Sequence, residues 1–200
     1  LWAAVCLFPL YWVAVTSLKN GNDIMQGPYY LPFIDFTPSL DGWAFILADP
    51  HENLVRRFAN SGFVAFSSTL LCLLLGGMAS YGLSRFRLPL NDNGVLMSLL
   101  LATRILPPAV LVLPLYFMAV YSHVLDTPWA LIVTYTAVNL PVAVWLLRPV
   151  FGPRASDQEE AAFLDGASRL RIFFEIALPM AAAAVAAAGL LIFILCWNEY

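Results

Sequence analysis

Five apolar segments, each long enough or nearly long enough to cross a lipid bilayer, constrain this chain more than any other feature. They comprise residues 1–18, 62–83, 95–121, 128–147 and 176–197. A span needs about 20 mostly apolar residues. Because backbone polar groups in lipid must find partners within their own segment, each span must be a helix. The sequence therefore predicts an all-α membrane protein, a polytopic helical bundle forming one domain over residues 1–200.

Composition supports this fold class and excludes several kinds of site. Hydrophobic residues make up 61% of the chain and charged residues 12%, against roughly 45–50% and about 25% in soluble domains. The net charge is −3 and no basic tract is present, so no nucleic-acid partner is expected. Cys6, Cys72 and Cys196 each lie inside an apolar run, which favours buried thiols over a disulfide or a metal site.

Lysine and arginine in the connecting loops predict the orientation of the bundle. One side carries six arginines, namely Arg85, Arg87, Arg148, Arg154, Arg169 and Arg171. The opposite loop, residues 19–60, carries Lys19, Arg56 and Arg57 among five acidic residues. The positive-inside rule therefore places the loop of residues 148–175 in the cytoplasm and the loop of residues 19–60 outside.

Prolines make the third and fourth segments irregular. Pro107, Pro108 and Pro114 interrupt the third, and Asn139 and Pro141 interrupt the fourth. Proline removes a backbone donor and kinks a helix, and bundles that move substrates often contain such breaks. Membrane helices also carry proline more often than soluble ones do, so a functional and a merely structural interpretation both stay open.

A polar strip, residues 159–179 (EEAAFLDGASRLRIFFEIALP), joins the last two segments. Ser156 and Glu159 fit a capping box that would start a short helix, with acids in its first turn, where the helix dipole favours them. Gly166 permits a turn or the close approach of another backbone. A helix lying on the bilayer would need a polar face rich in Lys and Arg. The acidic first half with small exposed residues instead favours docking into a groove on a protein partner.

The spacing within this strip is specific. Glu160-Ala161-Ala162 is followed by three residues and Gly166, and nine residues later by Ile176-Ala177-Leu178-Pro179. Every defined position matches the cytoplasmic motif E-A-A, three residues, G, nine residues, I-x-L-P, so the chain resembles the permeases of binding-protein-dependent ABC importers. It is similar to their sugar-importing, maltose-type branch in further segments: TSLK, LPPAVLVLPLY, LDTPWALI, NLPVAVWLL and the terminal WNEY. The resemblance covers essentially the whole chain.

The resemblance implies a multi-pass protein of the bacterial inner membrane that works in a larger assembly. Its expected partners are an ATPase subunit, a second permease subunit, an extracytoplasmic solute-binding protein, a sugar substrate and membrane lipid. In this family the motif helix docks in a cleft of the ATPase, and closure of the ATPase dimer rocks the bundle between inward-open and outward-open states. The residues implied in docking and coupling are Glu160, Ala161, Ala162, Leu164, Asp165, Gly166, Ile176, Leu178 and Pro179. Family members usually have six spans, so a sixth is expected outside this sequence.

Arg104 is the one charge well inside a predicted span. An arginine at mid-helix costs roughly 3 kcal/mol on insertion scales. It either lines the substrate path or pairs across the permease interface, or it lies near the inner end and extends toward the headgroups. The candidate residues of a translocation pathway are Arg104, Thr134, Asn139 and Asn198.

Patterns for catalysis are missing from the sequence. The sole lysine, Lys19, is not preceded by G-x-x-x-x-G-K, so ATP and Mg are expected in the partner ATPase, with no cofactor, metal or catalytic residue here. The expected function is a permease subunit of an ATP-driven carbohydrate importer. The alternatives are a permease of the same fold for a polyol, glycerol phosphate or peptide, or an ion-coupled secondary transporter. The identity of the sugar, direct contact with it, and pairing with a like or unlike permease stay open.

Overall fold

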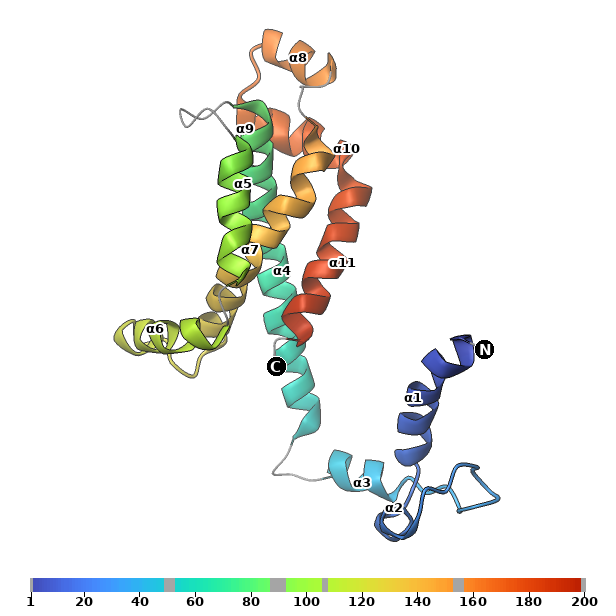
Figure 1. Ribbon diagram of the computed structural model, residues 1–200. Helices are drawn as coiled ribbons and strands as arrows, with labels where there is room; N and C mark the ends of the chain where they lie inside the picture. Colours follow the sequence, from blue (N-terminus) through green and yellow to red (C-terminus); the bar gives the residue numbers. More distant parts are fainter. Residues whose placement is uncertain (1, 49–52, 87–92, 106–107, 153–156, 199–200) are drawn as a thin grey trace. The chain divides into compact units, whose positions relative to one another are not determined.

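The computed structural model describes residues 2–48, 53–86, 93–105, 108–152 and 157–198 (Figure 1). Within these residues the regular structure is helical, apart from one isolated bridge between Pro32 and Phe36. The predicted all-α fold class is thereby confirmed. The chain divides into two compact units, Leu1–Ala59 and Asn60–Tyr200, which are described separately below.

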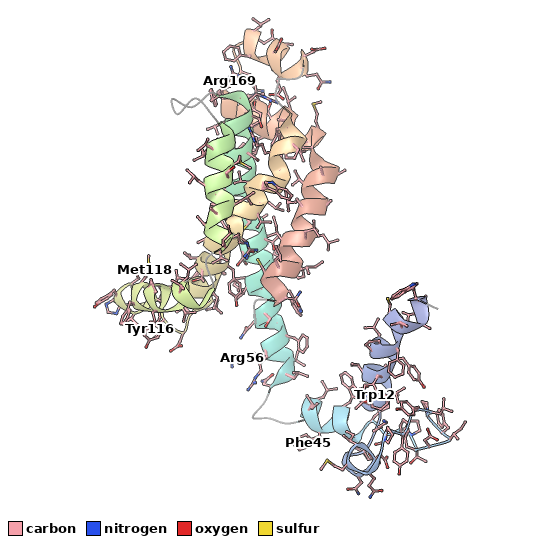
Figure 2. All side chains as sticks on the ribbon, in the orientation of Figure 1. Trp12, Phe45, Arg56, Tyr116, Met118 and Arg169 are labelled. Atoms are coloured by element: carbon pink, nitrogen blue, oxygen red, sulfur yellow. The ribbon has the colours of Figure 1, made fainter. Side chains whose placement is uncertain are left out.

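The first unit contains a buried lysine at its centre. Its helices are α1 (Trp2–Thr16), α2 (Gly21–Gln26) and α3 (Asp41–Ala48). Lys19 is buried, and its ammonium lies 4.4 Å from the centroid of the Trp12 ring (labelled in Figure 2) and 5.4 Å from that of Phe36. The Asp35 carboxylate accepts hydrogen bonds from two backbone amides, at 2.8 and 2.9 Å. Cation–π contacts and these backbone bonds therefore order a connection that has little regular structure.

The second unit is a bundle with a cap of short helices at one end. In chain order its elements are α4 (Leu54–Arg85), which begins in the first unit, α5 (Asn93–Ala102), the 3-10 turn η1 (Thr103–Ile105), α6 (Pro108–Tyr121), α7 (Pro128–Phe151), α8 (Asp157–Leu164), α9 (Arg169–Ile172), the π-helical turn η2 (Phe173–Ala177), α10 (Leu178–Met180) and α11 (Ala182–Asn198). Figure 1 shows α4, α5, α7 and α11 running alongside one another, with α8, α9 and α10 gathered at one end.

Two helices in the described part of the chain, α4 and α7, are long and apolar enough to cross a membrane. Two bent pairs of helices, formed by α5 with α6 and by the segment Arg169–Met180 with α11, raise the number to four if each counts as one span. α1 is apolar but has 15 residues. The second and fourth predicted spans thus fall on α4 and α7, which are longer than predicted, while the third and fifth fall on the bent pairs and the first on the shorter α1.

Helices α4 and α7 pack closely because small side chains meet between them. A Cβ atom placed on Gly76 would lie 2.8 Å from the Cβ of Ala143. Ala65 and Cys72 on α4 and Ile132 and Ala143 on α7 are almost completely buried in the same core, together with Ile192 of α11. Hydroxyl groups in α4 are satisfied by the backbone, as in the bond from Ser80 Oγ to the Gly76 carbonyl at 2.7 Å. Small residues at the contact are what helix pairs in lipid need for close approach.

The prolines of the fourth predicted span do not interrupt it. α7 continues from Pro128 to Phe151 through Pro141 and Pro149, so the predicted break at Asn139 and Pro141 is wrong. A proline deletes one intrahelical bond, but a buried helix in lipid keeps the remaining ones because its backbone has no other partner. In the third span Pro108 is the first residue of α6, as suits a missing N–H, and Pro114 lies inside that helix. Pro107 lies outside the described residues.

The last predicted span has a sharp bend near its start. The segment Arg169–Met180 and α11 are inclined by 83° to each other. Ala181 at the corner has φ −89° and ψ 1°, and its N–H donates to the carbonyls of Ala177 and Leu178 at 3.1 and 3.2 Å. Ile176 therefore lies before the corner, and the straight helix begins at Ala182, six residues later than predicted.

Candidate functional site

The candidate site begins with α8, which is followed by a turn that needs glycine. Gly166 has φ +87°, a left-handed conformation that costs other residues roughly 1–2 kcal/mol. Its N–H donates to the Phe163 carbonyl at 3.1 Å, and the Ala167 N–H donates to the Ala162 carbonyl at 3.0 Å. This pair of bonds is a Schellman motif, which satisfies the last carbonyls of a helix. Apart from the two adjoining residues, no described atom lies within 4 Å of a Cβ built on Gly166, so its left-handed turn is the reason for the glycine that the described residues show.

A second helical segment starts directly after this turn. The Ser168 hydroxyl accepts a hydrogen bond from the Arg171 N–H at 3.3 Å and caps α9. The Arg169 guanidinium, labelled in Figure 2, lies 3.9 Å from the centroid of the Phe163 ring. This cation–π contact holds α8 against α9. Because α9, η2 and α10 follow one another without a gap, a continuous helical segment runs from Arg169 to the corner at Ala181, and the turn at Gly166 joins α8 to it.

The predicted docking residues divide between two environments. On α8 and its turn, Glu160, Ala161, Leu164, Asp165 and Gly166 are exposed and Ala162 is half-buried. Leu164 is 86% exposed, which leaves a large apolar side chain beside two acids. The positions of Glu160, Ala161 and Leu164 lie on one face of a helix because residues four apart are neighbours. The structure thus brings Glu160, Ala161 and Leu164 together on one accessible face.

The second half of the motif lies in the connecting segment. Ile176 and Leu178 are half-buried, and Leu178 packs against a core cluster that includes Tyr81, Phe151 and Phe173. Pro179 is exposed near the start of α10. These residues support the connection between α8 and α11, and they are not part of the exposed face of α8.

The opposite face of α8 carries a buried acid that sequence reasoning did not select. The Glu159 carboxylate accepts two hydrogen bonds from Arg85: Nη2 to Oε1 at 2.6 Å and Nε to Oε2 at 2.9 Å. Oε2 also accepts the Tyr81 hydroxyl at 2.9 Å. Arg85 Nη1 donates to the carbonyl of Gly152 at 3.1 Å, at the end of α7. Ser156, the other member of the predicted capping box, lies outside the described residues.

An aromatic cluster lies beneath this ion pair. The Tyr81 ring is 5.6 Å from that of Phe151 and 5.2 Å from that of Phe173, measured between centroids, and the last two are 6.0 Å apart. The three residues come from α4, α7 and η2, and all are buried. Aromatic pairs at these separations add to the stabilisation from burial, so the elements that contact α8 are themselves held together.

The predicted pathway residues come together only in part. Arg104 Nη2 donates to Asn139 Oδ1 at 2.9 Å, and Asn139 Nδ2 donates to the Tyr135 carbonyl at 3.0 Å and to Cys196 Sγ at 3.6 Å. Arg104 lies eleven residues after Asn93, which is about 16 Å along a helix. Its guanidinium thus pairs with a fully buried amide inside the bundle, and a role in translocation stays a prediction.

The other two pathway residues lie apart from this pair. Asn198 is exposed and donates to the Ile194 carbonyl of its own helix at 2.9 Å. Thr134 is half-buried on α7. In the part of the chain that the structure describes, no group of three or more His, Cys, Asp or Glu side chains is arranged to hold a metal ion.

Comparison with known proteins identifies the family. Residues 73–200 match the family described as binding-protein-dependent transport system inner membrane component. The diacetylchitobiose uptake system permease of Streptomyces coelicolor is 33% identical over 203 residues, which cover 100% of this chain and 64% of that protein. The sulfoquinovosyl glycerol transport system permease of Agrobacterium fabrum is 32% identical over 97% of this chain and 66% of that protein. The trehalose/maltose transport system permease of Thermococcus litoralis is 30% identical over 100% of this chain and 70% of that protein.

The chain therefore spans about two thirds of the length of these relatives. The matched residues include both halves of the motif between Glu160 and Pro179, on which the predicted family and the predicted inner-membrane location were based. Both predictions are confirmed: this chain belongs to the inner-membrane components of binding-protein-dependent transport systems.

Proposed function

We propose that this chain is a transmembrane permease subunit of an ATP-driven importer for a carbohydrate. Similarity along the whole chain to permeases named for diacetylchitobiose and for trehalose and maltose supports a sugar as the transported solute. The expected partners are an ATPase subunit that binds ATP and Mg, a second permease subunit and an extracytoplasmic solute-binding protein. Energy then comes from the partner ATPase, because this chain has no P-loop sequence.

The exposed face of α8 carries this proposal. It presents Glu160, Ala161 and Leu164 together on a short helix whose far end is fixed by the turn at Gly166. A short helix with one accessible face can lie in a groove of a partner, where its small residues allow close approach. The apolar Leu164 side chain, 86% exposed, would be buried in such a groove. We therefore assign ATPase docking to this face.

The connection from α8 to α11 supports a role in coupling. A displacement of α8 would pass through α9, η2 and α10 to the corner at Ala181, where the chain turns by 83° into α11. Half-buried Ile176 and Leu178 keep this connection packed on the bundle. Movement of the ATPase subunits would thereby rock the bundle between its two access states, as in transporters built around a central site.

A permease of the same fold for another solute is the second candidate. The relative from Agrobacterium fabrum is named for sulfoquinovosyl glycerol, so similar sequences serve a glycoside that also carries a glycerol unit. A polyol, a glycerol phosphate or a peptide would be distinguished from a sugar by the ligand of the cognate binding protein.

The test uses the full-length protein with its cognate ATPase, second permease and binding protein in proteoliposomes. We expect uptake of radiolabelled maltose or diacetylchitobiose that requires ATP and the binding protein. Glu160→Lys should lower both ATPase co-purification and uptake by about tenfold or more, the equivalent of a single lost interface contact. Glu175→Lys is the matched control, because Glu175 is an exposed acid on η2, outside the face of α8.

Three results would contradict the proposal. Retention of ATPase binding and uptake by Glu160→Lys would remove the docking assignment. Uptake of glycerol 3-phosphate or a dipeptide in place of both sugars would favour the second candidate. Uptake that needs no ATPase and collapses when a proton or sodium gradient is dissipated would identify an ion-coupled transporter.

A further inference from the structure

α8 is attached to the bundle mainly by one acidic side chain. Among its residues, Glu159 alone is buried, with 3% of its surface exposed. Its neighbours Asp157, Gln158, Glu160 and Ala161 are exposed. An amphipathic helix normally packs on its protein through apolar residues, so attachment through a carboxylate is unusual and needs a reason.

The partner of this carboxylate contacts three elements at once. Arg85 is the last residue of α4, its Nε and Nη2 hold both oxygens of Glu159 on α8, and its Nη1 holds the Gly152 carbonyl at the end of α7. The Arg85 and Glu159 side chains are 6% and 4% exposed. A bidentate pair fixes the orientation as well as the distance of its two groups, so this contact resists both translation and rotation of α8 against α4.

Burial distinguishes this pair from the ion pair that the structure describes between Arg171 and Glu175. Arg171 and Glu175 lie four residues apart, and their side chains are 66% and 59% exposed. Exposed pairs contribute little, whereas loss of one member of a buried pair leaves the other charge without its partner. A crevice of about 350 Å³ is lined by Arg85 and Glu159 together with Ala177, Met180 and Ala181, among others. The hydrogen bonds of the pair fasten α8 to α4 and to the end of α7.

We propose that Arg85 and Glu159 form a buried joint that transmits the movement of α8 to α4 and α7, in addition to the covalent connection to α11. Both are positioning residues: they act on the bundle, and the docking face of α8 remains the ATPase contact. Tyr81 orients the joint through its bond to Glu159 Oε2. This inference rests on the proposed function, since it concerns how a docked α8 is coupled.

The experiment separates docking from coupling in the reconstituted complex with all its subunits. Glu159→Gln keeps the side-chain shape and removes the charge. We expect ATPase co-purification and ATP hydrolysis within about twofold of wild type, and a fall of about fivefold or more in sugar transported per ATP, the lower end of coupling between sites. Glu175→Gln, which breaks the exposed pair, should leave this ratio unchanged. A purely structural role would reduce the yield of complex but leave the ratio of the purified complex at the wild-type value.

A distance measurement tests the joint directly. Spin labels on Gln158→Cys of α8, which is exposed and outside the docking face, and on Met78→Cys of α4, in a background without the native cysteines, should give one narrow distance distribution with and without ATP. Glu159→Gln should broaden it or make it depend on nucleotide. Glu159→Asp keeps the charge but shortens the side chain, so it should also lower the amount of sugar transported per ATP. It replaces Glu159→Gln in both measurements if that variant yields no complex.

The outcomes distinguish the two proposals. An unchanged transport-to-hydrolysis ratio and an unchanged distance distribution would overturn the joint. Loss of ATPase binding by Glu159→Gln to the extent expected for Glu160→Lys would also overturn it, because Glu159 would then belong to the docking surface. By contrast, failure of the wild-type chain to bind an ATPase, or full activity of Glu160→Lys, would overturn the proposed function itself.

Discussion

The contact between α4 and α7 at Gly76 gives the sharpest prediction of stability. Gly76 is buried, and a Cβ at this position would lie 2.8 Å from the Cβ of Ala143 and 3.4 Å from the backbone C of Ala143 and N of Val144. Around Gly82, six residues later on the same helix, no described atom lies within 4 Å of a built Cβ apart from its chain neighbours and its own helix backbone. Alanine at these two positions therefore tests the same chemical change with and without an obstacle.

The expected magnitude follows from the distances. At position 76 the two Cβ atoms must separate by at least about 0.6 Å to reach the 3.4 Å at which ordinary contacts begin, and the backbone of α7 cannot rotate out of the way. Overpacking of this kind costs typically 1–3 kcal/mol, and alanine in place of glycine in a helix returns up to about 1 kcal/mol. We therefore expect Gly76→Ala to lower the free energy of unfolding by about 1–2 kcal/mol after the two effects are combined, and Gly82→Ala to raise it by up to about 1 kcal/mol.

Equilibrium unfolding of the full-length protein in mixed micelles, followed by tryptophan fluorescence over a detergent titration, measures both changes. Ala143→Gly in the Gly76→Ala background should recover most of the loss, because it removes the 2.8 Å contact and leaves the two at 3.4 Å. If Gly76→Ala were as stable as Gly82→Ala, close approach of α4 and α7 at this point would be refuted.

Two further predictions concern the turn after α8 and the polar contact inside the bundle. Gly166→Ala should destabilise the end of α8 by about 1–2 kcal/mol because φ is +87°, which amide exchange in α8 would show as a faster rate. Gly166→Asn should give a rate between those of wild type and Gly166→Ala, since asparagine tolerates this conformation better. Equal exchange rates in all three proteins would contradict the Schellman turn. Asn139→Ala removes the acceptor of the Arg104 hydrogen bond at a fully buried site and should lower the free energy of unfolding by about 1–3 kcal/mol. Thr134→Ala, at a half-buried position on the same helix, is the control. An equally small loss of stability in both variants would contradict a stabilising role of the bond between Arg104 and Asn139.

Local patterns in the sequence were sufficient to predict the helical fold class, whereas the docking role of the motif residues stays a prediction. Apolar segments of membrane length correspond to helices because lipid leaves the backbone no other choice. The sequence offers two interpretations of Gly166, a turn or the close approach of another backbone. The positive φ of Gly166 supports the turn. The prediction of an interruption at Pro141 is wrong for the same reason that the helices were predictable. Pro141 removes one backbone hydrogen bond from α7, but in lipid the backbone still has no alternative to a helix.

Features that depend on tertiary contacts could not be predicted in this way. Arg85 and Glu159 are 74 residues apart, so no local spacing links them. In the sequence, Arg85 indicates only the orientation of the bundle, and Glu159 indicates only a helix cap. The corner at Ala181 lies beside a run of alanines, and such a run favours a continuous helix. At the corner, Ala177 and Ala181 pack in one buried cluster with Tyr81, Phe151 and Phe173, a tertiary contact that the local sequence does not indicate.

The two attachments of α8 lead to parts of the bundle that are themselves closely packed. One reaches α4 and α7 through Arg85, and the other reaches α11 through η2 and α10. Gly76 brings α4 against α7, and a Cβ on Gly189 of α11 would lie 2.9 Å from the Leu73 side chain of α4. Tightly packed interiors transmit displacement as units and do not deform continuously. A push on α8 should therefore rock α4, α7 and α11 together as one block, because sliding α11 alone would require Gly189 to leave its contact with α4 while Arg85 still held α8.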